Sequence, residues 1–187
     1  MASADAARTR LIEIVKVRSF STGGETKLAS GRSSSFYFDM KPSMLHPEGV
    51  YLIATLILDM LEGAKVDLIG GLEMGAVPLA VAAAAQSHAR GQPIPAFFVR
   101  KQAKNHGAQK LVEGLAPGET LRGKRVAVLE DVTTTGGSSM KAIEALRAEG
   151  AVIERVITVV DRLEGAADNF KAAGIRFQAL LTTADFR

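Results

Sequence analysis

The sequence predicts an α/β fold in which a central parallel sheet is flanked by helices. Short apolar runs, typical of buried strands, alternate with longer helical segments from residue 67 onward. The run at 125–131 ends in two acids and a threonine- and glycine-rich loop that leads into a helix. The segment before residue 67 lacks this alternation, so we expect it to form a small hood over the carboxyl edge of the sheet.

The N-terminal third predicts two helices on either side of a hairpin. Apolar residues spaced among charges indicate an amphipathic helix at residues 4–17. Residues 27–39 predict a small hairpin with glycine and serines at its turn. A second helix is expected at residues 46–62, because Pro47 suits its first turn and Gly63 its end.

The remaining elements alternate. Strands are expected at residues 67–71, 96–100, 125–131, 152–161 and 176–181, and helices at 75–90, 138–149 and 169–173. The strand at 125–131 is apolar on both faces, as expected where helices cover both sides of a sheet. The long polar stretch 101–122 is expected to lack secondary structure, and loops of that length are uncommon unless they are functional or disordered.

Size and composition predict a single domain over residues 1–187, with the hood contributed mainly by 1–45 and the core by 46–187. The 23 basic and 20 acidic side chains give a net charge of +3, which is too small to favour nucleic-acid binding. There is no cysteine, so disulfides and cysteine metal sites are excluded. We expect no membrane segment and no secretory signal, and therefore a cytoplasmic location.

The loop after the strand at 125–131 has the features of a phosphate site. Gly136 and Gly137 let the backbone approach a ligand closely, and the next helix points its N-terminus at the same place. Glu130 and Asp131 would repel a phosphate, so they suit sugar hydroxyls or a magnesium ion held by the ligand. A ribose that carries a phosphate satisfies both requirements. A plain acidic turn with a helix cap is the structural alternative.

Residues 128–137 resemble the phosphoribosyl-diphosphate (PRPP) signature of type I phosphoribosyltransferases. Two further blocks narrow the resemblance to the orotate phosphoribosyltransferases. Residues 100–107 are similar to that family's mobile catalytic loop, and residues 30–39 to its N-terminal substrate-binding segment. With Asp161 and Arg162, the match covers most of the chain in order. The resemblance implies a type I phosphoribosyltransferase fold with an N-terminal hood.

The resemblance also implies an activity. Ribose 5-phosphate would pass from PRPP to orotate, giving orotidine 5′-monophosphate and pyrophosphate in de novo pyrimidine biosynthesis, with Mg²⁺ as cofactor. The implied assembly is a homodimer whose catalytic loop is shared across the interface. Two alternatives stay open: a phosphoribosyltransferase for another base, and a catalytically silent PRPP-sensing regulator.

The resemblance assigns most of the site. The implied catalytic residues are Lys104, His106 and Asp131. The implied PRPP-binding residues are Arg100, Lys101, Lys104, His106, Glu130, Asp131, Val132, Thr133, Thr134, Thr135, Gly136, Gly137 and Ser138. No direct metal ligand is expected, since PRPP and water would hold the magnesium ion near Glu130 and Asp131. Four of these residues are cationic and could stabilise the negative charge of a departing pyrophosphate: Arg100, Lys101, Lys104 and His106. The alternative is a solvated basic loop.

The implied orotate-binding residues are Tyr37, Phe38, Thr135 and Arg162. A guanidinium can grip a carboxylate through two hydrogen bonds, which favours Arg162 as the partner of the anionic base. The alternative is a surface arginine paired with Asp161 or Glu164.

A second glycine-rich strand-to-helix loop, at residues 70–76, can offer backbone amides to the diphosphate. Some family members carry a lysine at the position of Met74, and a family lysine is replaced by Ala29, with Lys27 two residues earlier. Glu73 cannot bind a diphosphate directly, so we expect it to orient a lysine or a magnesium-bound water.

Overall fold

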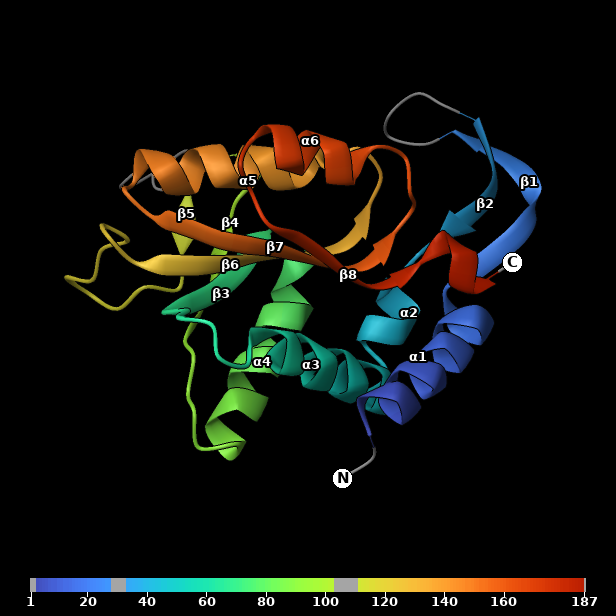
Figure 1. Cartoon of the computed structure of the whole chain (residues 1–187), viewed down its shortest axis with the longest axis horizontal. Helices are drawn as coiled ribbons and strands as arrows, with labels where there is room; N and C mark the ends of the chain where they lie inside the picture. The colour runs from blue at the N-terminus through green and yellow to red at the C-terminus, as the bar shows by residue number, and fades with distance from the viewer. Residues whose placement is uncertain (1–2, 28–32, 103–110, 187) are drawn as a thin grey trace.

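The computed structural model describes residues 3–27, 33–102 and 111–186 (Figure 1). The main sheet consists of β3 (Leu68–Leu72), β4 (Ala96–Val99), β5 (Val112–Glu113), β6 (Arg125–Thr133), β7 (Val152–Asp161) and β8 (Phe177–Thr182). The strand order is β5-β4-β3-β6-β7-β8, with all neighbours parallel except the antiparallel pair β4 and β5. The predicted parallel sheet is therefore confirmed.

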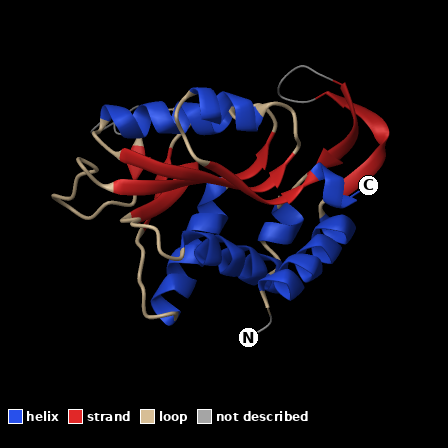
Figure 2. Cartoon of the chain, in the orientation of Figure 1, coloured by secondary structure: helices blue, strands red, loops and turns tan. Residues whose placement is uncertain are grey.

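Helices cover both faces of this sheet (Figures 1 and 2). One face carries α1 (Ala4–Arg18), α2 (Lys41–Met44), α3 (Pro47–Leu61) and α4 (Ala76–Ala89), and the other carries α5 (Gly137–Ala148) and α6 (Ala166–Ala172). Each layer has its own hydrophobic core, one beneath α1, α3 and α4 and one beneath α5 and α6. Among the described residues, no helix has the length and apolar character needed to cross a membrane.

The N-terminal hairpin is longer than the sequence predicts. It pairs β1 (Phe20–Lys27) with β2 (Ser33–Phe38) in a separate antiparallel sheet, whereas we expected it to begin at Lys27. The predicted start of the hairpin is wrong because the pair Gly23 and Gly24 is typical of a turn and not of a strand. In the structure the pairing register shifts between Thr22 and Thr26, so this stretch is an irregularity within a strand.

An aromatic cluster fastens the hairpin to the end of the chain. The ring centres of Phe20 and Phe38 lie 5.0 Å apart, and the ring centre of Phe186 lies 5.0 Å from that of Phe38. Phe186 belongs to the 3₁₀ helix η1 (Thr183–Phe186). Arg8 of α1 donates two hydrogen bonds, at 2.7 and 2.8 Å, to the Asp185 carboxylate in the same helix.

The first helix shares its core with the central domain. Leu11 and Val15 of α1 are fully buried in the same cluster as Ile53 of α3 and Leu79 of α4. Burying such side chains is worth about 1.5–3 kcal/mol each. The division into a hood, mainly residues 1–45, and a core, residues 46–187, stays a prediction, as does the single domain.

Further boundaries differ from expectation, among them the end of β6, which lies at Thr133 and not at residue 131. The polar stretch 101–122 contains the short strand β5, whose Val112 is buried and pairs with Val99. Two residues are too few to show a strand period. Helix α6 begins at Ala166, three residues earlier than predicted, where the buried Ala166 and Phe170 lie one turn apart.

Candidate active site

Four predicted segments meet at one edge of the main sheet. Neighbouring parallel strands β4, β3, β6 and β7 all end at this edge, so the residues that follow them lie close together. Arg100 follows β4, residues 73–75 follow β3, and Arg162 follows β7. Residues 131–137, called the 131–137 loop below, comprise the last three residues of β6 and the turn into α5. Open α/β sheets place their ligands at such an edge.

The loop at 131–137 leads into α5 through a glycine that no other residue can replace without strain. Gly136 has a φ of 87°, in the left-handed region that side chains rarely adopt. A Cβ at Gly136 would lie 2.8 Å from the ring of Phe170. Asn169 donates a hydrogen bond of 2.9 Å to the carbonyl of Thr135. Helix α6 therefore fixes the loop, and the N-terminus of α5 is presented to the sheet edge.

Glu130 is a buried acid at the base of this loop. Its side chain is 8% exposed, and its Oε2 accepts a hydrogen bond of 2.9 Å from the Ser139 hydroxyl in α5. Burial raises the pKa of the Glu130 carboxyl to about 8, and the charge of Asp131 acts in the same direction. Glu130 is therefore mostly protonated at neutral pH in the absence of a ligand.

Asp131 joins the two strand-to-helix loops. Its Oδ1 accepts a hydrogen bond of 2.9 Å from the N–H of Val132. A Cβ added at Gly75, in the neighbouring loop, would lie 2.5 Å from the same Oδ1. Only glycine leaves room for this carboxylate against the loop between β3 and α4.

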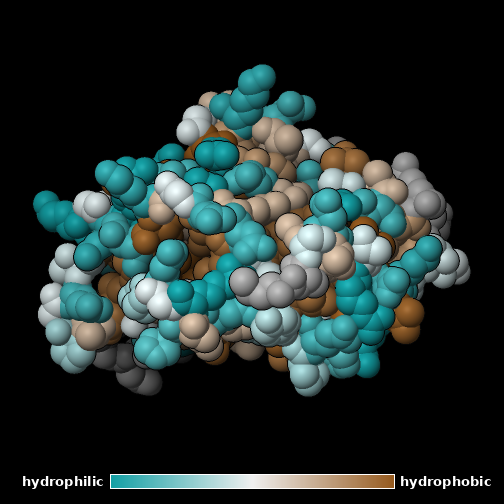
Figure 3. Space-filling view, turned by 60° about the horizontal axis from the view of Figure 1, so that its bottom comes forward, coloured by the Kyte–Doolittle hydropathy of each residue, from teal (hydrophilic) through white to brown (hydrophobic). Residues whose placement is uncertain are grey.

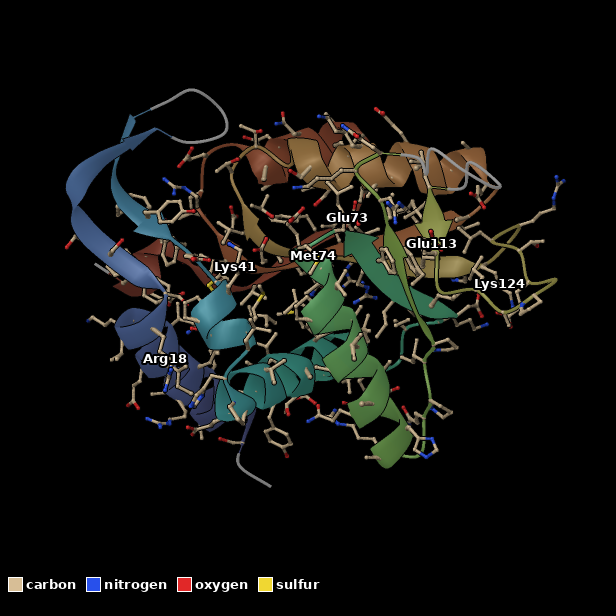
Figure 4. All side chains as sticks on the ribbon, turned by 180° about the vertical axis from the view of Figure 1, so that it is seen from behind. Arg18, Lys41, Glu73, Met74, Glu113 and Lys124 are labelled. Atoms are coloured by element: carbon tan, nitrogen blue, oxygen red, sulfur yellow. The ribbon has the colours of Figure 1, made fainter. Side chains whose placement is uncertain are left out.

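The loop between β3 and α4 is bound to the end of β4 (Figure 4). Glu73 accepts a hydrogen bond of 2.9 Å from the backbone N–H of Lys101, and its own N–H donates to the Val99 carbonyl at 2.8 Å. The peptide bond between Glu73 and Met74 is cis. We expected Glu73 to orient a lysine or a magnesium-bound water. The structure shows its carboxylate on the backbone N–H of Lys101, and a role in orienting a side chain or a bound water stays a prediction.

The two cations at the end of β4 stand beside β5. The N–H of Arg100 donates to the Leu111 carbonyl at 2.8 Å, and its guanidinium lies 3.9 Å from the Glu113 carboxylate. Lys101 is exposed. The predicted catalytic residues Lys104 and His106 lie outside the described residues.

Arg162 is buried at the end of β7. Its side chain is 2% exposed, and its Nε donates a hydrogen bond of 2.7 Å to Glu164. The guanidinium carbon lies 4.5 Å from the centre of the Phe36 ring in the hairpin. The alternative of a surface arginine is therefore wrong as to exposure, although the pairing with Glu164 is present.

The structure places the two predicted hairpin residues in different surroundings. Tyr37 is 40% exposed, whereas Phe38 is buried in the aromatic cluster. Lys41 follows the hairpin and donates a hydrogen bond of 2.9 Å to Asp39. This bond raises the pKa of Lys41, and the charges of Tyr37 and Asp131 contribute to the rise. Lys41 therefore lies within electrostatic reach of the acids of the 131–137 loop.

Phe36 belongs to the expected substrate-binding segment 30–39, and its ring lies against Arg162. Sequence reasoning missed two other residues of this edge: Ser139 donates a hydrogen bond to Glu130, and Glu113 lies beside Arg100. Only Ser139 had a signal, because it falls in the first turn of a helix beside the motif. Among the described residues, no group of three or more histidine, aspartate or glutamate side chains could hold a metal ion.

Comparison with known proteins defines the family. Residues 44–173 match the phosphoribosyl transferase domain family. The orotate phosphoribosyltransferase of Bradyrhizobium diazoefficiens is 56% identical over 184 residues, which cover 98% of each chain. That of Sorangium cellulosum is 45% identical over 183 residues, covering 96% of this chain and 92% of the relative.

Solved structures agree with these relatives. The Mycobacterium tuberculosis orotate phosphoribosyltransferase bound to Fe(III) dicitrate superposes with a TM-score of 0.82 at 39% identity, covering 96% of this chain and 98% of that one. The same enzyme in complex with PRPP gives a TM-score of 0.77 at 36% identity, with the same coverage. The chain therefore belongs to the phosphoribosyl transferase domain family and, within it, to the orotate phosphoribosyltransferases.

Proposed function

We propose that this chain transfers ribose 5-phosphate from PRPP to orotate, releasing pyrophosphate and forming orotidine 5′-monophosphate. The single observation that supports this most is the meeting of two features at one sheet edge. The loop 131–137 suits a phosphorylated ribose, and the buried Arg162 one strand away suits an anionic base. The loop 131–137 and Arg162 thus each suit one of the two substrates of a single reaction.

PRPP would lie across the loop 131–137 and the end of β4. The backbone amides and hydroxyls of residues 132–138 would hold the 5-phosphate at the N-terminus of α5, and Asp131 would accept hydrogen bonds from the ribose hydroxyls. The diphosphate would face Arg100 and Lys101, with the predicted residues Lys104 and His106 adding positive charge. We keep these assignments as proposals.

Orotate would lie between the hairpin and Arg162. The guanidinium is already oriented by Glu164 and by the Phe36 ring, so little freedom is lost when a carboxylate binds. The backbone at Tyr37 and Phe38, together with Thr135, would complete the base pocket.

The reaction breaks the bond between C1 of the ribose and a diphosphate oxygen, which leaves as pyrophosphate, and forms a bond from C1 to a ring nitrogen of orotate, which gives up its proton. The transition state should resemble an oxocarbenium ion, as in glycoside hydrolysis. The chain's task is then to stabilise the negative charge that develops on pyrophosphate and to keep water away from C1.

Two adjacent acids fit the magnesium ion that PRPP chemistry implies. Asp131 offers carboxylate oxygens, the ligand type that Mg²⁺ prefers, and Glu130 would do so once it has lost its proton; binding through water suits a site with only two acids. When bound, the ion would neutralise charge on the diphosphate. Full activity in excess chelator would contradict this cofactor.

The test of the proposed function follows the absorbance of orotate in the presence and absence of PRPP. Consumption that requires PRPP supports the proposal. Turnover of a purine or uracil in place of orotate would favour the first alternative. PRPP binding without turnover of any base would favour the silent regulator.

A homodimer with a shared catalytic loop is the assembly that we propose. Exposed apolar side chains on α3 and α4, among them Tyr51 at 58% and Val81 at 60% exposure, offer a surface for a second copy. Figure 3 shows apolar residues among polar ones on the face that carries these helices.

Mixing two inactive homodimers tests the shared loop. One carries Lys104→Ala and the other Asp131→Asn. If the loop serves the partner's site, a re-assorted heterodimer has one doubly damaged site and one intact site, and about half of the normal activity per dimer returns. No recovery in verified heterodimers would rule out the shared site. The cytoplasmic location stays a prediction from the sequence.

A further inference from the structure

Glu73 connects two strand ends through the backbone. Its side chain leaves the loop between β3 and α4 and accepts the N–H of Lys101 at 2.9 Å, just beyond β4. Its own N–H donates to the Val99 carbonyl at 2.8 Å. The two hydrogen bonds span the residues at which the chain leaves the sheet, so they fix the course of the backbone there.

Asp131 lies against the other side of the same loop. Gly75 lies so close that an added Cβ would be 2.5 Å from the Asp131 Oδ1. Residues 72–76 therefore fill the space between the end of β6, where the ribose phosphate is proposed to bind, and the end of β4, where Arg100 and Lys101 begin. Figure 4 shows Glu73 and Met74 at the N-terminal end of α4.

A carboxylate at this place needs a physical reason. Glu73 stands beside the proposed diphosphate position, where a negative charge weakens the binding of an anion. The Lys101 N–H needs an acceptor where the chain leaves the sheet, and a side-chain oxygen at this place accepts it and holds both partners in a fixed geometry. The hydrogen bond to Lys101 supplies that reason. It involves the backbone N–H of Lys101 and not its side-chain ammonium group.

We propose that Glu73 is a positioning residue for the diphosphate of PRPP. By holding the N–H of Lys101, it sets where the Arg100 and Lys101 side chains stand relative to the loop 131–137. It acts as a hydrogen-bond acceptor and not through its charge. The inference rests on the proposed function, which supplies PRPP as the ligand.

The acceptor role and a charge role predict different behaviour of two variants. Glu73→Gln keeps a side-chain oxygen that can accept the Lys101 N–H, while Glu73→Ala removes it. A glutamate that orients a lysine ammonium or a metal-bound water would need its charge, so Gln would be as poor as Ala.

Glu119 supplies a matched control. Its Oε2 accepts a backbone N–H, that of Ala116, at 2.9 Å. The bond has the same chemistry as that of Glu73, but it lies in the loop between β5 and β6. Glu119→Ala therefore removes an equivalent hydrogen bond away from the proposed site.

The measurement is the affinity for PRPP and for pyrophosphate by titration calorimetry, with the Michaelis constants of PRPP and orotate alongside. We expect Glu73→Ala to weaken PRPP and pyrophosphate binding about fivefold, the loss typical of one hydrogen bond. The orotate Michaelis constant should change less than about twofold. Glu73→Gln and Glu119→Ala should match the parent chain.

Equal losses in Glu73→Gln and Glu73→Ala would overturn the inference, as would an Ala variant that binds PRPP normally. An equal loss of orotate and PRPP binding would show general damage and would also overturn it. Hydrogen exchange at the Lys101 amide gives an independent reading, since it should accelerate in Glu73→Ala and not in Glu119→Ala. If the chain consumes no orotate but pyrophosphate binding follows the expected order, the proposed function fails and the positioning role stands.

Discussion

Two neighbouring loops at the same sheet edge differ in how they are built. Both connect a parallel strand to a helix, β6 to α5 and β3 to α4. The first gathers acids, threonines and serines, so its chemistry lies in side chains. The second is composed largely of glycines and apolar residues, and it is shaped by backbone hydrogen bonds and by the absence of a side chain at Gly75. One sheet edge therefore combines a loop rich in polar side chains with a loop shaped by its backbone, and we propose that the first binds the ligand and the second positions its neighbours.

Two glutamates, Glu130 at the end of β6 and Glu73 in the loop between β3 and α4, show the contrast. Glu130 is 8% exposed, and its pKa is raised to about 8 by burial and by Asp131. Glu73 is only half-buried, and one of its carboxylate oxygens accepts a hydrogen bond from a backbone N–H. Burial therefore keeps the Glu130 carboxyl mostly neutral, whereas the Glu73 carboxylate accepts a backbone N–H from a neighbouring strand end.

The largest expected effect concerns the pH dependence of stability at Glu130. A pKa of about 8 in the folded state, against an ordinary 4.5, means that folding favours the protonated acid. The free energy of unfolding should therefore fall as pH rises from about 4.5 to about 8, because deprotonation of this buried carboxyl then favours the unfolded chain. Glu130→Gln copies the protonated form and should lose this part of the pH dependence.

The measurement is denaturant unfolding of both chains at pH 5 and pH 9 without magnesium. The advantage of Glu130→Gln should be small at pH 5 and large at pH 9. Glu144→Gln, an exposed glutamate on α5, is the control and should show no such divergence. Parallel pH profiles for Glu130→Gln and the parent chain would contradict the assignment of a buried, protonated acid.

The next effect separates the acids of the two loops by activity. Asp131→Asn should lower kcat/KM for PRPP roughly 100-fold, the size expected when a charged hydrogen-bond partner is lost in a desolvated site. The fold should persist, because an asparagine oxygen can still accept the Val132 N–H. Glu73→Gln should leave the same constant near its normal value. Steady-state kinetics of both variants tests this difference. Equal losses of kcat/KM for PRPP in Asp131→Asn and Glu73→Gln would show that the two acids do not differ in this way.

A smaller effect comes from the contact between the loops. Gly75→Ala places a Cβ within 2.5 Å of the Asp131 Oδ1, so the carboxylate must rotate away. We expect about a tenfold loss of PRPP affinity, and a double-mutant cycle shows whether it arises through Asp131. In that case Gly75→Ala combined with Asp131→Asn is no worse than Asp131→Asn alone. Additive losses would mean that the two loops act independently.

The sequence predicts most of the fold because most elements are long and periodic. The helix α3 and the strand β7 were predicted to within one residue, since each is a sustained apolar pattern. The strand β1 was missed because Gly23 and Gly24 interrupt it, and β5 because two residues show no period. Both exist through pairing with a partner strand, which local sequence does not record.

The site divides in the same way. The motif at 128–137 is visible because its chemistry lies in consecutive side chains. The contacts of Glu73 with Lys101, of Gly75 with Asp131 and of Phe36 with Arg162 were not predicted. Each joins residues at least 28 positions apart, brought together by strand order rather than by spacing.

The smallest expected effect adds side-chain chemistry to the positioning loop. Met74 is 64% exposed at the start of α4, next to the proposed diphosphate position, so a longer polar side chain can replace it without disturbing a core. Exposed ion pairs are worth about 0.2–1 kcal/mol. Met74→Lys should therefore lower the Michaelis constant for PRPP only about two- to threefold. The gain should shrink at high salt, because screening acts on exposed charges. Met74→Gln, which has a similar length and no charge, should give no gain. A large, salt-independent gain would mean that this loop binds the diphosphate directly, and the division between a binding loop and a positioning loop would then fail.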